Sequence, residues 1–214
     1  MSARGAVGGR GLCVALDLRH PFSYLALAPS FAFAAQLELE VDWLPIRAQA
    51  LRAPSAPGPA DDRGIRHRRA RAEMIAREIA VYAGVQGLAI ESPYRDGPAD
   101  AFHFAWLWVR EREPLRLRAL LEQAFRRYWA VALDPESPGD VARLLGALDF
   151  DLSRFREWAR ADGPAALDAA RSALAGAGVD QAPAYVLGGE VFYGRQHLPM
   201  LRWILQGRSG ERPI

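Results

Sequence analysis

An apolar segment that leads directly into a proline-started helix places the strongest constraint on the fold of this chain. Leu12 to Leu18 form a short apolar run typical of a buried strand, and Tyr24 to Leu37 repeat apolar side chains with helical spacing. His20 and Pro21 lie between them. Proline is favoured at the first helical position, where its missing N–H costs no hydrogen bond. The sequence therefore predicts a strand followed at once by a helix, with His20 at the positive end of that helix.

The order of the remaining segments indicates an α/β fold divided by a long helical stretch. Leu37 to Trp43 alternate apolar and acidic side chains and predict a second strand, which completes a βαβ unit. After Gly178 the pattern changes to two short strands, joined by Gly188-Gly189 as a hairpin turn. These strands are Ala184 to Leu187 and Glu190 to Tyr193, and the further predicted helices are Arg63 to Ala83, Ala99 to Arg112, Pro114 to Ala130, Asp140 to Ala147, Ser153 to Ala161, Pro164 to Ala177 and Leu198 to Leu205.

This order predicts three parts along the chain. Residues 1–11 form a flexible N-terminal tail, residues 12–60 together with 179–214 form one α/β domain, and residues 61–178 form an all-helical subdomain inserted into it. We expect the first βα turn and the start of the third strand to meet at the same end of the sheet.

Composition excludes several classes of function. Cys13 is the single cysteine, which excludes an internal disulfide and Cys-rich zinc sites and suits a reducing cytoplasm. A net charge of +2 gives no nucleic-acid signal. The segment after Met1 does not read as a secretory signal, and no apolar window is long enough to span a membrane. His67 and His103 lack partners at ligand spacing, so no metal site is predicted.

Ala182-Pro183 stands directly before the third predicted strand. An X-Pro bond is the only type that adopts the cis form at low cost, and we predict a cis bond here rather than a trans proline that starts an edge strand. A cis bond would leave the backbone N–H and C=O of Ala182 free to pair with an extended ligand.

Two further clusters admit alternative interpretations. The arginine-rich run Arg63 to Arg71 is either a solvated first part of a helix or an anion-binding rim above a cleft. An aromatic group is expected to form mostly the core of the helical part, with some members available to line an apolar pocket. Its members are Phe102, Phe104, Trp106, Trp108, Tyr128 and Trp129.

Both ends of the chain resemble a known family. His20 to Tyr24, Val41 to Pro45 and Gly178 to Gly194 resemble the 2-hydroxychromene-2-carboxylate isomerase and kappa-class glutathione transferase branch of the DsbA superfamily. The resemblance covers about Leu12 to Gly207. It implies an α/β, thioredoxin-like fold with a large all-helical insertion between the second and third strands. It also implies glutathione as cofactor, and a homodimer in the cytoplasm.

The resemblance also assigns site residues. The family has a serine next to the glutathione sulfur where this chain has His20, and Ser23 lies one helical turn further; these two are the catalytic candidates. The chain departs from the family pattern at Glu78, Gln196 and His197. The candidates for binding glutathione are Pro21, Ala182, Pro183, Arg195 and Gln196.

The chemistry of His20 leaves two interpretations open. A neutral imidazole at a helix N-terminus resists protonation, because the helix dipole disfavours a second positive charge. It could accept the proton of a bound thiol and hold the thiolate beside it. In the other interpretation His20 only stabilises the turn. Ser23 is equally open, because its hydroxyl either contacts the ligand or bonds back to a carbonyl.

Two functions are consistent with these residues. The first is a glutathione-dependent isomerase or transferase that acts on a small aromatic or electrophilic substrate. The second is a non-catalytic thioredoxin-fold binding module that has lost thiol chemistry. A thiol–disulfide oxidoreductase is excluded, because neither His20 nor Ser23 can form a mixed disulfide.

Overall fold

The structure is a computed structural model that describes residues 11–59 and 61–213. Its centre is a four-stranded sheet in the order β2-β1-β3-β4. β2 runs parallel to β1, whereas β3 is antiparallel to β1 and β4 is antiparallel to β3. The strands are β1 (Leu12–Leu16), β2 (Val41–Pro45), β3 (Ala184–Leu187) and β4 (Glu190–Tyr193). The predicted β-α-β, helical stretch, β-β-α order is therefore confirmed.

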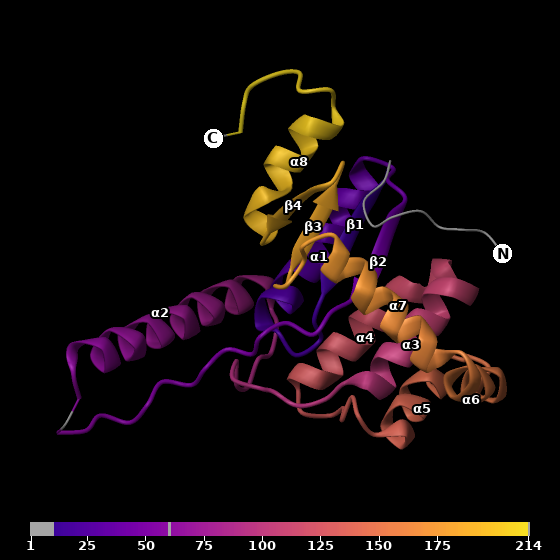
Figure 1. The fold of residues 1–214 in the computed structure, drawn as a ribbon, viewed down its shortest axis with the longest axis horizontal. Helices are drawn as coiled ribbons and strands as arrows, with labels where there is room; N and C mark the ends of the chain where they lie inside the picture. The colour runs from indigo at the N-terminus through magenta and orange to yellow at the C-terminus, as the bar shows by residue number, and fades with distance from the viewer. Residues whose placement is uncertain (1–10, 60, 214) are drawn as a thin grey trace.

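Within the described residues between β2 and β3, every regular element is helical. Figure 1 shows helices α3 to α7 grouped beyond the β2 side of the sheet, while α8 lies beside β3 and β4 at the opposite side. The helical elements are α1 (Pro21–Gln36), α2 (Arg63–Gln86), α3 (Asp100–Arg112), the 3₁₀ turn η1 (Pro114–Arg116), α4 (Leu117–Trp129), α5 (Pro138–Gly146), α6 (Leu152–Ala161), α7 (Gly163–Gly176), the 3₁₀ turn η2 (Arg195–His197) and α8 (Leu198–Leu205).

β1 is the buried centre of the fold, and all five of its residues are buried. An unbroken apolar run suits a strand that is covered on both faces. The strand ends at Leu16, two residues before the predicted end, because Asp17 already belongs to the turn that leads into α1. α1 begins at Pro21 itself, with His20 as its N-cap residue.

The predicted second strand was wrong at its start. α1 continues to Gln36, and Leu37 caps it through its N–H, which donates to the carbonyl of Phe33. Glu38 then adopts a left-handed conformation with φ of 51°. Leu37 to Leu39 therefore serve the end of the helix, and β2 begins only at Val41. Alternation of apolar and acidic residues does not distinguish a strand from a capped helix end followed by a turn.

The apolar side chains of the helical part are continuous with those of the sheet and form one core with them. Trp106 of α3 is fully buried and its indole N–H donates to the carbonyl of Trp43 at 3.1 Å. At the edge of the same contact, Arg110 forms two bonds to the Asp42 carboxylate, at 2.5 and 2.7 Å. These contacts fix α3 against the strand.

α2 is the longest helix and projects from the rest of the molecule (Figure 1). Asp62 caps its N-terminus by accepting from the N–H of Ile65, and Gly87 ends it in a left-handed conformation. The helix extends three residues beyond its predicted end at Ala83. It packs on α1 through a small cluster of Leu25, Ile79 and Ala83.

The predicted tail 1–11 falls, apart from Gly11, outside the described residues. Among the residues that are described, no helix is both long enough and apolar enough to cross a bilayer. The same part of the chain contains no group of three or more His, Cys, Asp or Glu side chains placed to hold a metal ion.

Candidate active site

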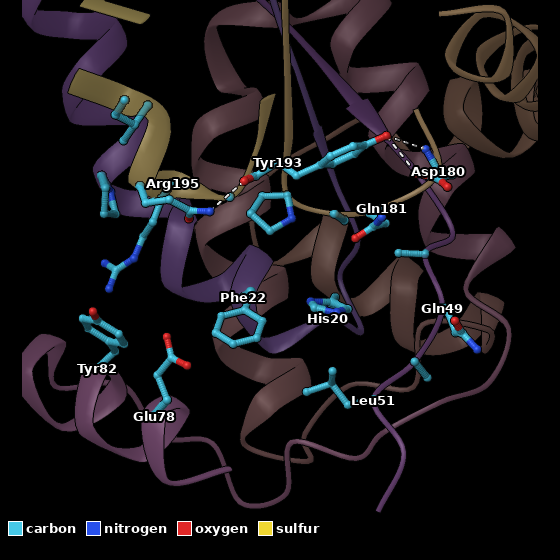
Figure 2. Close-up of a pocket in the computed structure, with 18 of the residues that line it drawn as sticks. His20, Phe22, Gln49, Leu51, Glu78, Tyr82, Asp180, Gln181, Tyr193 and Arg195 are labelled. Atoms are coloured by element: carbon cyan, nitrogen blue, oxygen red, sulfur yellow. Dashed lines mark hydrogen bonds between the residues drawn. The ribbon is translucent and has the colours of Figure 1, made fainter. Parts of the chain in front are cut away.

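A cavity of about 1410 Å³ opens at the end of the sheet where β1 leads into α1. Its wall is built from segments that are far apart in the sequence: the start of α1, the extended strap 48–52 that follows β2, the side of α2, the residues before β3, and η2 with the start of α8. Figure 2 shows His20 in the middle of these lining side chains. The cavity is large enough for a peptide-sized ligand and a second small molecule.

His20 lies at the N-terminus of α1 and lines this cavity. Its Nδ1 is buried and has no hydrogen-bond partner among the described residues. Burial lowers the pKa of His20 below its usual value; the nearby Asp17 carboxylate acts against this shift, and the Arg19 guanidinium adds to it. The imidazole is therefore neutral at neutral pH.

The turn that carries His20 is held by the backbone of Asp17. The N–H of His20 donates to the carbonyl of Asp17 at 3.1 Å, and the N–H of Asp17 donates to Ser23 Oγ at 3.1 Å. Ser23 is fully buried and does not line the cavity. The structure thus places the two catalytic candidates differently. His20 faces the cavity, whereas the buried Ser23 hydroxyl stabilises the turn by accepting the hydrogen bond from the N–H of Asp17.

The Ala182-Pro183 peptide bond is cis, and both residues line the same cavity as His20 and Phe22. The N–H and C=O of Ala182 lie outside the β3 ladder, whose first paired residue is Ala184. This backbone is therefore placed to pair with an extended ligand.

Gly194 closes the C-terminal side of the site. Its N–H donates to the carbonyl of Pro183 at 2.9 Å, and its φ of 91° suits glycine alone. A Cβ at this position would also lie 2.1 Å from the amide oxygen of Gln196. The Gln196 side chain folds back over this glycine and donates to the carbonyl of Tyr193. Gln196 thus lines the cavity with its amide already engaged.

Arg195 lines the cavity on the wall opposite the strap. Its guanidinium lies 4.2 Å from the centre of the Tyr82 ring of α2, and it donates to the carbonyl of Leu25 at 3.5 Å. Figure 2 shows the Glu78 carboxylate beside Tyr82 on the same helix. Arg195 therefore joins the wall formed by η2 to the wall formed by α2.

The charged side chains of the wall have both signs. Arg52, Arg71 and Arg195 supply positive charge, and Glu78 and Asp180 supply negative charge. Within the described part of the chain, no ion pair involves any of these five residues. Guanidinium groups without a carboxylate partner suit the carboxylates of a ligand. Of the basic run Arg63 to Arg71, the last residue reaches the cavity wall.

The chain matches a known protein family. The sequence profile of the DSBA-like thioredoxin domain matches residues 14–206. The chain belongs to this family. No curated protein sequence matches the chain at a significant level. The thioredoxin-like fold expected from the sequence is thereby confirmed.

Solved structures of this fold align over nearly the whole chain. A 2-hydroxychromene-2-carboxylate isomerase has a TM-score of 0.68 and 19% identity, covering 92% of this chain and 94% of its own. A probable DsbA oxidoreductase from Streptomyces coelicolor has a TM-score of 0.66 and 19% identity, covering 95% and 92%. The cytosolic disulfide reductase DsbM from Pseudomonas aeruginosa, solved with GSH, has a TM-score of 0.58 and 14% identity, covering 92% and 93%. At these identities the likeness concerns the fold.

The aromatic residues of the cavity differ from those considered in the sequence. None of the six aromatic residues between Phe102 and Trp129 that were singled out there lines it. Phe22, Tyr82 and Tyr193 do so instead. Tyr193 donates to the Asp180 carboxylate at 2.8 Å, which fixes its ring at the cavity edge. The position of Phe22, directly after the His20-Pro21 turn of this DSBA-like chain, was the one available signal.

Cys13 lies on β1 and is 1% exposed. Burial, together with the Asp42 carboxylate and against the effect of Arg110, raises the pKa of its thiol to about 12. We expect iodoacetamide to alkylate Cys13 in the folded protein at least about 100-fold more slowly than in urea, because the thiolate is the reactive form. Mass spectrometry of timed samples measures this ratio. Rapid alkylation of the folded protein would show that β1 opens.

Proposed function

We propose that this DSBA-like protein is a glutathione-dependent isomerase or transferase for a small aromatic or electrophilic substrate. The observation that carries the proposal is His20: a neutral imidazole at a helix N-terminus, in a cavity that it shares with the cis Ala182-Pro183 bond. The two structural relatives, an isomerase of 2-hydroxychromene-2-carboxylate and a reductase solved with GSH, support the choice of chemistry.

The residues present fit a thiol tripeptide. The backbone of Ala182 pairs with the extended peptide. The guanidinium groups of Arg52, Arg71 and Arg195, which have no carboxylate partner among the described residues, are available to its carboxylates. The neutral imidazole of His20 lines the same cavity and meets the ligand thiol there. Because Nδ1 is buried, the ring nitrogen that meets the thiol is Nε2.

His20 performs the proton transfer in this mechanism. Its ring accepts the proton of the ligand thiol, and the resulting imidazolium lies beside the thiolate and stabilises it. When bound, glutathione supplies a nucleophile that adds reversibly to the substrate and permits rotation about a bond before it leaves. Ser23 keeps the His20 turn in place through its bond from Asp17, and the chain's one cysteine, buried on β1, takes no part.

Thermal denaturation with glutathione tests the proposal. A ligand at 100 times its Kd stabilises a protein by about 2.7 kcal/mol, which raises the Tm of a chain of this size by roughly 5–10 °C. We expect such a shift with millimolar glutathione, and a smaller shift with the tripeptide that carries alanine in place of cysteine. The difference between the two ligands reports recognition of the thiol.

The absence of any shift would favour the alternative function, a binding module without thiol chemistry. The engaged amide of Gln196 and the carboxylate of Glu78 in the cavity are the features of this chain that motivate this alternative. A shift of equal size with both tripeptides would indicate binding of the peptide without use of its sulfur.

The division into domains, the assembly and the location of the protein stay predictions. The proposal includes an α/β domain of residues 12–60 and 179–214, a helical subdomain of residues 61–178 and a homodimer in the cytoplasm. Of the helical subdomain, only α2 contributes to the cavity wall. Sedimentation analysis of the purified protein tests the dimer.

A further inference from the structure

A buried ion pair lies directly before His20 in the sequence and behind the cavity wall. The side chains of Asp17 and Arg19 are 1% and 2% exposed, and their closest atoms are 2.6 Å apart. Neither residue lines the cavity. Buried charges are costly unless each of their polar atoms has a partner, so the partners show what the pair does.

Arg19 uses all five of its N–H donors. Nε and one terminal nitrogen form two parallel bonds to the Asp17 carboxylate, at 3.0 and 2.6 Å. The second terminal nitrogen donates to Asp96 at 2.8 Å and to the carbonyl of Gly97 at 2.7 Å. The remaining donor points to the carbonyl of Ala48 at 3.3 Å. A lysine, with three donors on one nitrogen, cannot replace this set.

Asp17 is equally occupied. One carboxylate oxygen accepts from the backbone N–H of Arg19 at 2.9 Å as well as from its side chain, and the other accepts from the N–H of Ala48 at 2.8 Å. The backbone of Asp17 meanwhile holds His20 and Ser23, as described above. One residue therefore connects the His20 turn to the beginning of the strap.

The segments that this pair joins are those that shape the cavity. Ala48 is followed by Gln49 to Arg52, all of which line the cavity, and this strap has no regular secondary structure of its own. Asp96 and Gly97 belong to the helical part of the chain, just before α3. The ion pair thus connects the His20 turn, the strap and the helical part at one point.

We propose that Arg19 and Asp17 are positioning residues, which hold the His20 ring and the strap in the geometry that the cavity needs and couple that geometry to the helical part. This function concerns the shape of the site rather than its chemistry. The positioning role rests on the proposed function only in the measurement of glutathione-dependent turnover. A displacement of about 1 Å at a reacting group can cost about 100-fold in rate, so the consequence is measurable.

The main test is Arg19→Lys, which keeps the buried positive charge and removes the planar guanidinium with its five N–H donors. We expect the pKa of His20, followed by NMR titration of its ring, to rise toward the ordinary value of about 6.5, because a displaced ring is better hydrated. Hydrogen exchange of 46–52 should increase in the same variant, and glutathione-dependent kcat/KM should fall by about tenfold or more. The charged groups that otherwise face His20 are unchanged in the variant; they are Asp17, Arg52, Arg71, Glu78, Asp180 and Arg195.

The double variant Asp17→Asn/Arg19→Met provides a second test if Arg19→Lys does not fold. It leaves no buried charge uncompensated, because Asp96, which loses its bond to Arg19, is 65% exposed. Replacing a buried pair in this way is often tolerated. The double variant should show the same loosening of the strap. The His20 pKa is not the readout in this variant, because the change removes both the Asp17 carboxylate, which raises that pKa, and the Arg19 guanidinium, which lowers it. The matched control is Asp42→Asn/Arg110→Met, which removes another two-bond pair remote from the cavity and should change neither the exchange of the strap nor the His20 pKa.

Unchanged exchange of 46–52 in whichever of these variants folds would overturn the positioning role, and so would an unchanged His20 pKa in folded Arg19→Lys. Equal changes in the control pair would also overturn it, because they would report general loosening. If the wild-type protein neither binds nor uses glutathione, the proposed function fails, but the titration of His20 and the exchange of the strap still decide this inference.

Discussion

Replacing His20 by alanine is expected to lower kcat/KM for glutathione-dependent turnover by about 100-fold or more, the usual size of a positioned acid–base contribution. The ring faces the cavity and makes no hydrogen bond to the protein through Nδ1, so its loss removes the proton acceptor and leaves the fold intact. Steady-state kinetics with saturating glutathione measures the effect, and a circular dichroism melt verifies the fold.

Two variants make this result specific. His67→Ala removes a histidine from the exposed side of α2, outside the cavity, and should leave kcat/KM unchanged. His20→Ser introduces the serine that the 2-hydroxychromene-2-carboxylate isomerase and kappa-class glutathione transferase branch, which this turn resembles, has at this position, and should recover part of the loss. If His20→Ala binds glutathione and retains the wild-type rate, His20 is a bystander, and the contact with the thiol must be reassigned to Ser23.

The pH dependence of turnover has a predicted sign. His20 must be neutral to accept a proton, and burial lowers its pKa, so the neutral form persists to a more acidic pH than in an exposed histidine. We expect the rate to rise with pH through an apparent pKa that belongs to the coupled His20–thiol pair. In His20→Ala the profile should follow the thiol alone. The same acid limb in both proteins would contradict this assignment.

The largest expected effect on stability comes from Asp17→Asn. This change leaves the buried Arg19 guanidinium with only the Asp96 carboxylate as a counter-charge, and that carboxylate is 65% exposed. Arginine does not lose its proton in proteins. Breaking one side of a buried pair costs about 3–5 kcal/mol, a large fraction of the 5–15 kcal/mol that typically stabilises a folded domain. Urea denaturation measures the loss as a lower midpoint at constant m-value.

Asp42→Asn provides the control for this measurement. Asp42 forms two bonds to Arg110, as Asp17 does to Arg19, but its side chain is 35% exposed. Water can therefore solvate the arginine that remains, and we expect a loss of about 1 kcal/mol or less. Equal losses in the two variants would mean that burial of the Asp17 pair is not what makes it important.

The order of the elements could be predicted because it depends on local patterns. Unbroken apolar runs, the Pro21 turn and the Gly188-Gly189 hairpin each leave a signal within a few residues, and β3, β4 and α8 have the predicted bounds. The start of β2 was mispredicted because Leu37 to Leu39 fit both the alternation of a strand and the capped end of a helix followed by a turn. Only the extension of α1 over Gln36 decides between them.

The site was predictable only in part, for a related reason. His20, the cis Ala182-Pro183 bond and Arg195 follow local turn signals or the family resemblance. The Arg19 network does not, because its bonds to Ala48 and Asp96 span 29 and 77 residues. In the sequence, Asp17 and Arg19 are two charges near a strand end, where solvent exposure is the ordinary expectation. Their burial depends on a helical part that covers them.

The pairing of β1 with β3 has a consequence for the order in which the protein is made. β1 leaves the ribosome about 170 residues before its antiparallel neighbour β3. At 5–20 residues per second, this interval lasts roughly 10–30 s. During that time one edge of an entirely apolar strand has no partner, which is the condition under which strands pair with the wrong chain. Until β3 emerges, protection of this edge of β1 must come from other parts of the nascent chain or from a chaperone.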